Sequence, residues 1–229
     1  MSNRQIMFSS MLPNGGGGGG GCAPITNTTT SINATGGNSD GEAVATNYWR
    51  RGASAQIWTP SEIGSSKQIT ALQYQQSNTL ALSFFTYNDI VIRMCHTSST
   101  SFSSTNTLVG TWPNIEIPGL SNKSDEIEVH NGPWSITNST GWQTLNLDTN
   151  FCYNGTDNLV IMIIKDDQVD ESYLDTARWV YSGDSQVGSD SFWYSSDYYD
   201  MNGLSISPSS STSKKGDINS GRPLLRVKH

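Results

Sequence analysis

The residues best suited to chemistry form an acidic run that follows an apolar stretch. In KDDQVDESYLD (165–175) the carboxylates are Asp166, Asp167, Asp170, Glu171 and Asp175. Calcium takes about six to eight hard oxygen ligands from flexible loops. This run supplies enough of them, so it is our candidate for a structural calcium site, and calcium is the only cofactor we consider. The spacing is not that of an EF-hand, and the alternative is a solvated acidic loop.

Aromatic side chains gather in a second stretch, SDSFWYSSDYYD (189–200). A strand buries alternate residues, so we expect some of these rings to stay exposed among Ser and Asp. Exposed aromatics are typical of protein interfaces and of sugar-binding faces, and the alternative is packing over the edge of the domain. The candidate interface or ligand residues are Trp193, Tyr194, Tyr198 and Tyr199.

Catalytic constellations are sparse, and we expect no enzyme. His96 follows Cys95, but neighbouring residues on a strand point to opposite faces and cannot form a nucleophile–base pair. His229 is terminal and expected to be mobile. Two facing carboxylates of a glycoside hydrolase stay open as an alternative, because acidic residues are common and none stands out. The carboxylates of one further stretch are expected to be solvated at a strand edge: Asp125, Glu126 and Glu128.

The cysteines limit the covalent structure. There are three of them, Cys22, Cys95 and Cys152, and no CxxC pair that would indicate zinc. At most one internal disulfide can form. Cys95 and Cys152 both lie in strand-like segments and are the candidate neighbours, but two reduced, partly buried thiols are the favoured interpretation.

The elements that position these residues are predicted to be strands. Alternating or apolar runs are separated at short intervals by Gly, Asn, Ser and Pro, and no helical period persists. The run 158–165 is apolar on both faces and predicts a central buried strand, whereas 80–85 and 89–95 are predicted to be joined by a turn at 86–89. The pattern predicts an all-β fold, an antiparallel jelly-roll β-sandwich. Further strands are expected at 67–76, 142–148, 177–181, 191–194 and 223–227.

The first 45 residues have a different composition. Seven glycines at 15–21 follow a short apolar stretch and precede a Thr/Asn-rich segment, and such a chain loses much entropy on ordering. We expect residues 1–45 to be an extended anchoring arm, or else a flexible linker, and 46–229 to be the jelly-roll domain. The anchor residues for a partner are expected to be Ile6, Phe8, Met11 and Leu12.

Charge and hydropathy exclude some partners. The formal net charge is −7, with 34% hydrophobic residues and 14% charged residues. Binding of phosphate backbones needs clustered Lys and Arg, so we expect no nucleic-acid partner. We expect no membrane insertion either, because no apolar run has the length of a span. The N-terminus has no apolar region typical of a signal peptide, so we expect a protein made in the cytosol.

Several segments resemble a known family. GWQTLNLDTNFCYNGTDNLVIMI (141–163), SAQIWTPSEIGSSKQITALQY (54–74), TSFSSTNTLVG (100–110) and GRPLLRV (221–227) are similar to the jelly-roll, cleaved-adhesin or MAM-like modules of Bacteroidetes-type surface proteins. The resemblance implies a galactose-binding-like jelly roll that binds glycans, proteins or host surfaces, often with structural calcium, and does not imply an enzyme.

These expectations combine into a functional prediction. A cytosolically made chain with a surface-type sandwich and an N-terminal arm is typical of a phage virion protein. We expect a capsid decoration, head-fibre or tail adhesion module, homo-oligomeric, anchored to capsid or tail subunits and able to contact a host-surface glycan through many weak sites. The alternative is a secreted or cell-surface glycan- or protein-binding adhesin module, located outside the cell.

Overall fold

The structure is a computed structural model, and almost all of its regular structure is β. It describes residues 22–32, 38–40, 44–45, 51–80, 84–102, 109–111, 114–116, 123, 125–166, 177–181, 191–196, 214–219 and 222–229. Within these residues the one helix is α1 (Pro60–Ile63), and all strand pairs are antiparallel. The all-β antiparallel prediction is confirmed, while the jelly-roll connectivity stays a prediction.

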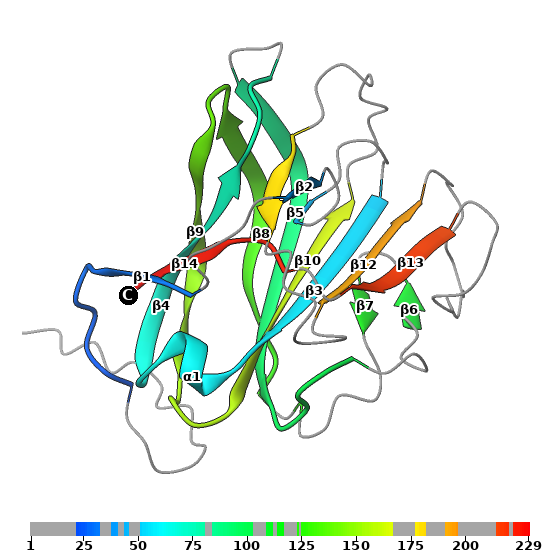
Figure 1. Cartoon of the computed structure of the whole chain (residues 1–229). Helices are drawn as coiled ribbons and strands as arrows, with labels where there is room; N and C mark the ends of the chain where they lie inside the picture. The colour runs from blue at the N-terminus through cyan, green and yellow to red at the C-terminus, as the bar shows by residue number, and fades with distance from the viewer. Residues whose placement is uncertain are drawn as a thin grey trace, which may run out of the picture.

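One layer, sheet A, contains the two ends of the described chain side by side. Its strands are β1 (Thr29–Ser31), β2 (Asn38–Asp40), β4 (Lys67–Gln76), β9 (Gly141–Tyr153), β11 (Trp179–Tyr181) and β14 (Leu225–Lys228). The order is β1-β14-β4-β11-β2, and β9 pairs with β4. The N-terminal strand β1 therefore adds to the C-terminal strand β14, on the left of Figure 1.

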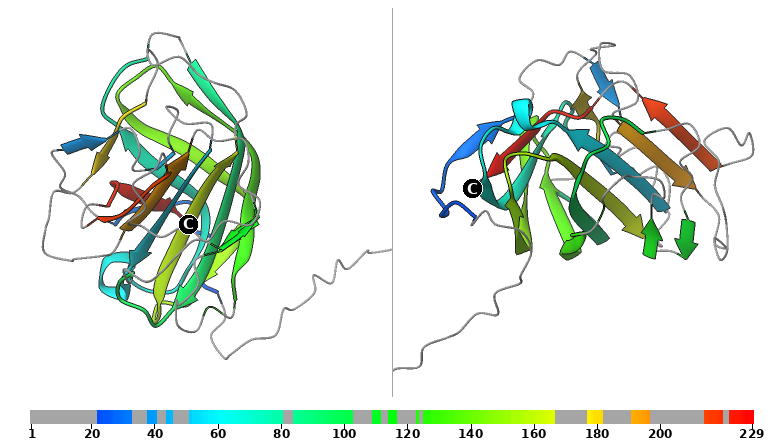
Figure 2. Two further views of the ribbon diagram at one scale, coloured as in Figure 1. Left: turned by 90° about the vertical axis from the view of Figure 1, so that its right-hand side faces the viewer. Right: turned by 90° about the horizontal axis from the view of Figure 1, so that it is seen from below.

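The second layer, sheet B, has the order β13-β12-β3-β10-β5-β8. A separate hairpin joins β6 (Val109–Thr111) to β7 (Asn114–Glu116). Figure 2 shows the strands of sheet B side by side from two further directions. The bounds of the strands of sheet B are β3 (Arg51–Trp58), β5 (Phe84–Thr97), β8 (Ile127–Thr137), β10 (Asn158–Asp166), β12 (Ser191–Ser196) and β13 (Lys214–Asn219).

The core lies between the two sheets and is rich in aromatic rings. Alternate residues of β4 and β14 from sheet A meet those of β5 and β10 from sheet B in one buried cluster. Trp134 of β8 stacks on Trp179 of β11 at 5.2 Å, which joins the layers, and Tyr74 of β4 meets the edge of Trp179 at 6.4 Å. Such ring pairs add about 0.5–1.5 kcal/mol each beyond the burial of their area.

The apolar run 158–165 is the central strand that the sequence predicts. β10 pairs with β3 on one side and β5 on the other, and every residue from Asn158 to Lys165 is buried. The turn predicted at 86–89 is wrong, because β5 runs straight through it. A register shift between Tyr87 and Ile90 takes its place. Strict alternation would turn Ile90 away from the core, and the bulge restores its inward orientation.

Apart from the strand edge expected at Glu128, the edge strand β8 was not predicted from the sequence. It contains Asn131, Gly132 and Pro133, which are typical of turns. Proline lacks an N–H donor and is accepted on edge strands, and β8 ends the order of sheet B.

The N-terminal region differs most from expectation. Cys22 forms a disulfide with Cys152, across 130 positions of sequence, whereas Cys95 is free and buried. The candidate neighbours Cys95 and Cys152 are therefore not partners, and the favoured interpretation of both as reduced thiols is wrong for Cys152. Burial, with the charge of Glu126, raises the pKa of the Cys95 thiol to about 12.

Part of the expected arm belongs to the sandwich. β1 pairs with β14, β2 pairs with β11, and Val44 and Ala45 are buried in the core. This corrects the expected boundary at residue 45 for the described residues of that region. The physical reason is that pairing with β14 of the same chain and the nearby disulfide hold β1 in place, so that no partner is needed to order it. Residues 1–21, with the anchor candidates Ile6, Phe8, Met11 and Leu12, lie outside the described residues.

Candidate functional site

The predicted calcium residues fall almost entirely outside the described part of the chain. Asp166 is the last residue of β10, and Asp167, Asp170, Glu171 and Asp175 are not described. Among the described residues, no group of three or more His, Cys, Asp or Glu side chains gathers as a metal site would. The calcium site stays a prediction.

The predicted aromatic surface is described only in part. Trp193 and Tyr194 lie on β12, which has β3 on one side and β13 on the other. Tyr198 and Tyr199 lie outside the described residues. The structure thus places Trp193 and Tyr194 on the second strand of sheet B, and the role of the four aromatic residues as an interface or ligand surface stays a prediction.

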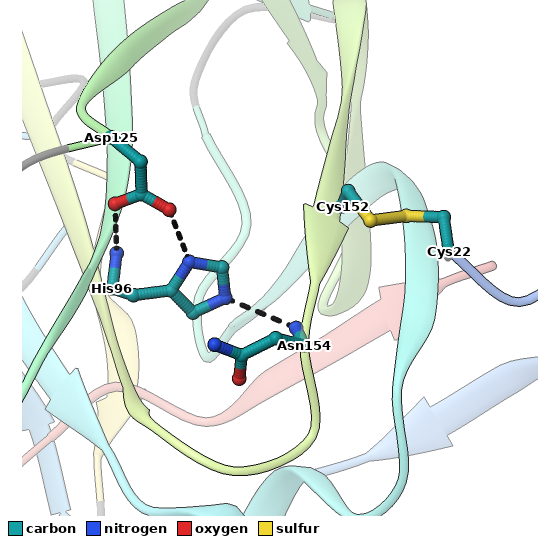
Figure 3. The surroundings of a disulfide bond; sticks show 5 residues. All are labelled: Cys22, His96, Asp125, Cys152 and Asn154. Atoms are coloured by element: carbon teal, nitrogen blue, oxygen red, sulfur yellow. Dashed lines mark hydrogen bonds and ion pairs between the residues drawn. A yellow bond between two sulfur atoms is a disulfide. The ribbon is translucent and has the colours of Figure 1, made fainter. Parts of the chain in front are cut away.

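A His–Asp pair that the sequence did not single out lies near the disulfide, as Figure 3 shows. The backbone N–H of His96 donates to Asp125 Oδ1 at 2.9 Å, and Nδ1 of the ring contacts Asp125 Oδ2. The backbone N–H of Asn154 donates to Nε2 of the same ring at 3.1 Å. The ring stacks on Tyr153 and tilts against Phe151. The expectation that Asp125 is merely solvated at a strand edge is therefore wrong.

These contacts determine the tautomer of His96. Because Nε2 accepts a hydrogen bond, the proton of the neutral ring must be on Nδ1, where it is donated to the Asp125 carboxylate. A histidine that acts as a general base needs a free nitrogen facing the substrate, and here both nitrogens already have protein partners. The trio therefore holds three segments together at one end of the sandwich: the end of β5, the segment before β8, and the β9–β10 turn.

The β9–β10 turn is closed by local hydrogen bonds. Asn154 Oδ1 accepts the backbone N–H groups of Thr156 and Asp157 at 2.9 and 3.0 Å, the usual pattern of an Asx turn. Gly155 has φ +81°, and a Cβ atom at this position would lie 2.5 Å from the backbone nitrogen of Ser66. Only glycine fits this close approach.

The consecutive strands β8 and β9 lie in different sheets, and side-chain hydrogen bonds connect them. Trp134 Nε1 donates to the carbonyl of Thr144 at 3.1 Å, and the N–H of Asn131 donates to Asp148 Oδ2 at 2.9 Å. His130, also at this seam, is 8% exposed. Its Nδ1 lies 3.1 Å from Asp148 Oδ2, yet the ring is not aligned for a hydrogen bond. We regard this pair as an electrostatic contact only.

The C-terminal histidine is held rather than mobile, which corrects the expectation. The backbone of His229 exchanges two 2.9 Å hydrogen bonds with Thr28, and its Nε2 lies 2.8 Å from Thr30 Oγ1. Burial, with the positive charge of Lys67, lowers the pKa of His229. Burial likewise lowers the pKa of Lys67, whose Nζ donates to the Ile63 carbonyl at 2.7 Å.

An ion pair fastens the segment before β14 to α1. Arg222 donates to Glu62 through both Nη groups, at 3.1 and 2.5 Å, and to the Ile57 carbonyl at 2.8 Å, while its guanidinium lies 4.2 Å from the Trp58 ring. Glu62 also accepts the backbone N–H of Thr59 at 2.8 Å. Burial raises the pKa of Glu62, but the Arg222 and Thr59 hydrogen bonds and the charge of Arg222 outweigh it, so the net shift is downward.

The outer face of sheet A carries an ordered row of polar side chains. Ser31, Arg226, Gln73 and Thr144 are directly paired across β1, β14, β4 and β9. We call these four residues, together with Trp142 of β9, the Arg226 face. Arg226 Nε donates to Ser31 Oγ at 3.0 Å, Gln73 donates to Thr144 Oγ1 at 2.8 Å, and the guanidinium lies 3.9 Å from the Trp142 ring.

Alternation in the sequence predicts the part of the Arg226 face that lies on β9. The alternation of 142–148 predicts that Gln143, Leu145 and Leu147 share one side, and all three are buried or packed against the core. Trp142 and Thr144 must then point outward. Arg226 joins the face only through the pairing of β14 with β4. Its contact with Trp142 joins residues far apart in sequence.

The comparisons with known proteins place the chain in no family. No protein-family model matches it, and no curated protein matches it. A solved structure that matches contains the cysteine protease and lectin-like domains of Cwp84, a surface layer associated protein of Clostridium difficile. The identity is 9%, the match covers 78% of this chain and 31% of that chain, and the TM-score is 0.37. At that score the likeness carries no conclusion, and the resemblance to cleaved-adhesin modules stays a prediction.

No helix among the described residues is long and apolar enough to cross a bilayer.

Proposed function

We propose that this chain is an attachment module, in which the sandwich is displayed outward and the residues before Cys22 connect it to a larger assembly. In the form we favour, that assembly is a virion, and the chain serves as a capsid decoration, head fibre or tail adhesion module in several copies. The observation that carries the proposal is the Cys22–Cys152 disulfide, which lies at the point where such a connection enters the sandwich.

The disulfide changes the path that a pulling force takes. Without it, tension on the N-terminal residues would act on the short β1–β14 ladder, whose paired residues are Thr29, Thr30 and Ser31. With it, tension passes through a covalent bond to Cys152 on β9, which pairs with Gln68 of the long strand β4. A module that holds a particle on a surface benefits from this arrangement, because hydrogen-bonded ends open before the core does.

The same disulfide supports a second candidate, a secreted or cell-surface adhesin module. Disulfides persist in oxidising surroundings, which include virion and cell surfaces, and are rare in the cytosol. Both candidates place the mature sandwich outside the reducing cytoplasm. They differ in when the bond forms: during export for a secreted module, and after release for a virion protein assembled in the cytoplasm.

Truncation tests the attachment role. A chain that lacks residues 1–21 keeps Cys22 and the whole described sandwich, so it should fold with unchanged melting temperature. It should no longer join the particle in which the full-length chain is found, as measured by co-sedimentation. A full-length chain with Cys22→Ser and Cys152→Ser serves as the control and should still be incorporated. Normal incorporation of the truncated chain would refute the anchoring role.

The redox state of the chain separates the two candidates. Particles purified from lysed cells under alkylating conditions should contain reduced Cys22 and Cys152 if the protein is assembled in the cytoplasm. Fully oxidised protein in a culture medium free of particles would instead support the secreted adhesin.

A further inference from the structure

The guanidinium of Arg226 is fixed in orientation by two neighbours. Its Cζ lies over the Trp142 ring, 3.9 Å from the ring centroid, and Nε donates to Ser31 Oγ. Among the described residues, neither Nη group has a hydrogen-bond or ion-pair partner. A guanidinium stacked on an aromatic ring and held by Nε presents its remaining N–H groups as a fork that matches carboxylate and sulfate oxygens.

The charge of this face is opposite to that of the chain. Lys228 lies two positions after Arg226 on β14, about 7 Å along the strand and on the same side. The positions paired with these two cations are Thr29, Ser31, Ala71 and Gln73, none of which is acidic. The whole chain has a net charge of −7. A cationic patch on an otherwise anionic protein is complementary to an anionic ligand.

The neighbours of Arg226 favour a saccharide as the carrier of that anion. Ser31, Gln73 and Thr144 offer hydroxyl and amide groups, which can donate to and accept from sugar hydroxyls. The row crosses three strand spacings of about 4.8 Å, or about 14 Å in all, which suits a short chain of sugar rings rather than a single ion. Trp142 supplies aromatic surface at one side of the row.

We propose that the Arg226 face binds acidic oligosaccharides, with the Arg226 fork on a carboxylate or sulfate group of the sugar. The inference rests on the proposed attachment function, for which it names the ligand class. It differs from the candidate aromatic residues Trp193 and Tyr194, which lie on β12 of the other sheet.

Binding is measured with defined probes at low salt, by calorimetry or biolayer interferometry of the full-length oxidised protein. Heparin carries sulfate groups, polygalacturonate carries carboxylates alone, dextran is neutral, and poly-glutamate is an acidic peptide. We expect binding to heparin or to polygalacturonate, with the better of the two identifying the preferred oxyanion, and no binding to dextran. Failure of both acidic saccharides to bind, or tighter binding of poly-glutamate, overturns the inference.

Two variants separate a built site from general electrostatic attraction. Arg226→Lys keeps the positive charge but removes the fork of N–H groups and the contact of the guanidinium with the Trp142 ring, and should weaken binding about tenfold or more. Lys215→Ala removes a cation from β13 of sheet B and should leave binding within about twofold. Equal losses in the two variants overturn the inference, as does an Arg226→Lys variant that binds like the parent.

Two further measurements keep the result interpretable. Arg226→Lys must melt within a few degrees of the parent, because the residue lies on an outer face. Binding should also change the fluorescence of Trp142, which lies beside Arg226, and Trp142→Phe should reduce that change. Loss of saccharide binding with normal particle incorporation would overturn the ligand but leave the attachment function. Normal saccharide binding by a full-length chain that does not join the particle would support the ligand but overturn the attachment function.

Discussion

Replacing Glu62 with Gln removes the charge that faces Arg222 while keeping the size of the side chain. Arg222 is 6% exposed and would lose the carboxylate charge of Glu62, the ion-pair partner that the described residues provide. Breaking a buried pair on one side costs about 3–5 kcal/mol, and because the Glu62 side chain is 24% exposed we take the lower end, about 3 kcal/mol. For a chain of this length that lowers the melting temperature by about 6–12 °C.

The pH dependence of the same variant gives a second and sharper test. The folded-state pKa of Glu62 is lowered from 4.5, so its stabilising contribution is fully present above the unfolded pKa. That contribution is lost as the pH falls through the folded pKa. The difference in melting temperature between the parent and Glu62→Gln should therefore be constant from pH 7 to about pH 5 and shrink below about pH 4.5.

Scanning calorimetry from pH 7 to pH 3 checks both expectations. Glu128→Gln is the matched control, since Glu128 is exposed and accepts a hydrogen bond from Asn131 three positions along the chain. It should change the melting temperature by no more than about 2 °C. A Glu62→Gln variant as stable as this control at pH 7, or a difference that does not depend on pH, would refute the reasoning about the ion pair.

Three further changes should act at separate places in the fold. Replacing Cys22 and Cys152 with Ser opens a loop that the disulfide closes over 130 positions. Chain entropy sets an upper bound of about 5 kcal/mol on the resulting loss of unfolding free energy, which denaturant titration measures. An unchanged unfolding free energy would mean that the bond does not form. Gly155→Ala places Cβ 2.5 Å from the Ser66 nitrogen in a positive-φ turn and should cost about 1–3 kcal/mol in the same assay; an unchanged midpoint would contradict the close approach. The buried Tyr74 hydroxyl has no hydrogen-bond partner among the described residues, so Tyr74→Phe should be neutral or stabilise by up to about 1 kcal/mol, and a clear destabilisation would reveal a partner.

Local pattern was enough to predict the long strands. The run 158–165 is apolar at every position but its ends, and this short length with flanking Asn and Gly favours a strand buried on both faces. The strand β4 over 67–76 has the predicted bounds. The residues of β5 were predicted as strands as well, but Asn88 and Asp89 indicated a turn. They are the exposed residues of a bulge, and local sequence does not distinguish the two because both favour the same polar residues.

Contacts between distant segments could not be predicted in the same way. Cys22 lies beside a glycine run that indicates an unfolded arm, and its partner Cys152 is 130 positions away. Asp125 meets His96 only because β5 and β8 are neighbours in sheet B. The Arg226 face requires four strands from four separate parts of the chain. Such sites depend on topology, and alternation within one strand carries no information on which strand lies next to it.

The measurement that tests the account most directly is peptide mapping of the monomer under non-reducing conditions, with mass spectrometry and prior alkylation of free thiols. We predict one cross-linked peptide pair that joins Cys22 to Cys152 within a single chain, and a Cys95 that alkylates only after unfolding. A Cys22 that alkylates in the native protein, or that joins two chains, would contradict the account, because the N-terminal connection would then not be fastened to its own sandwich.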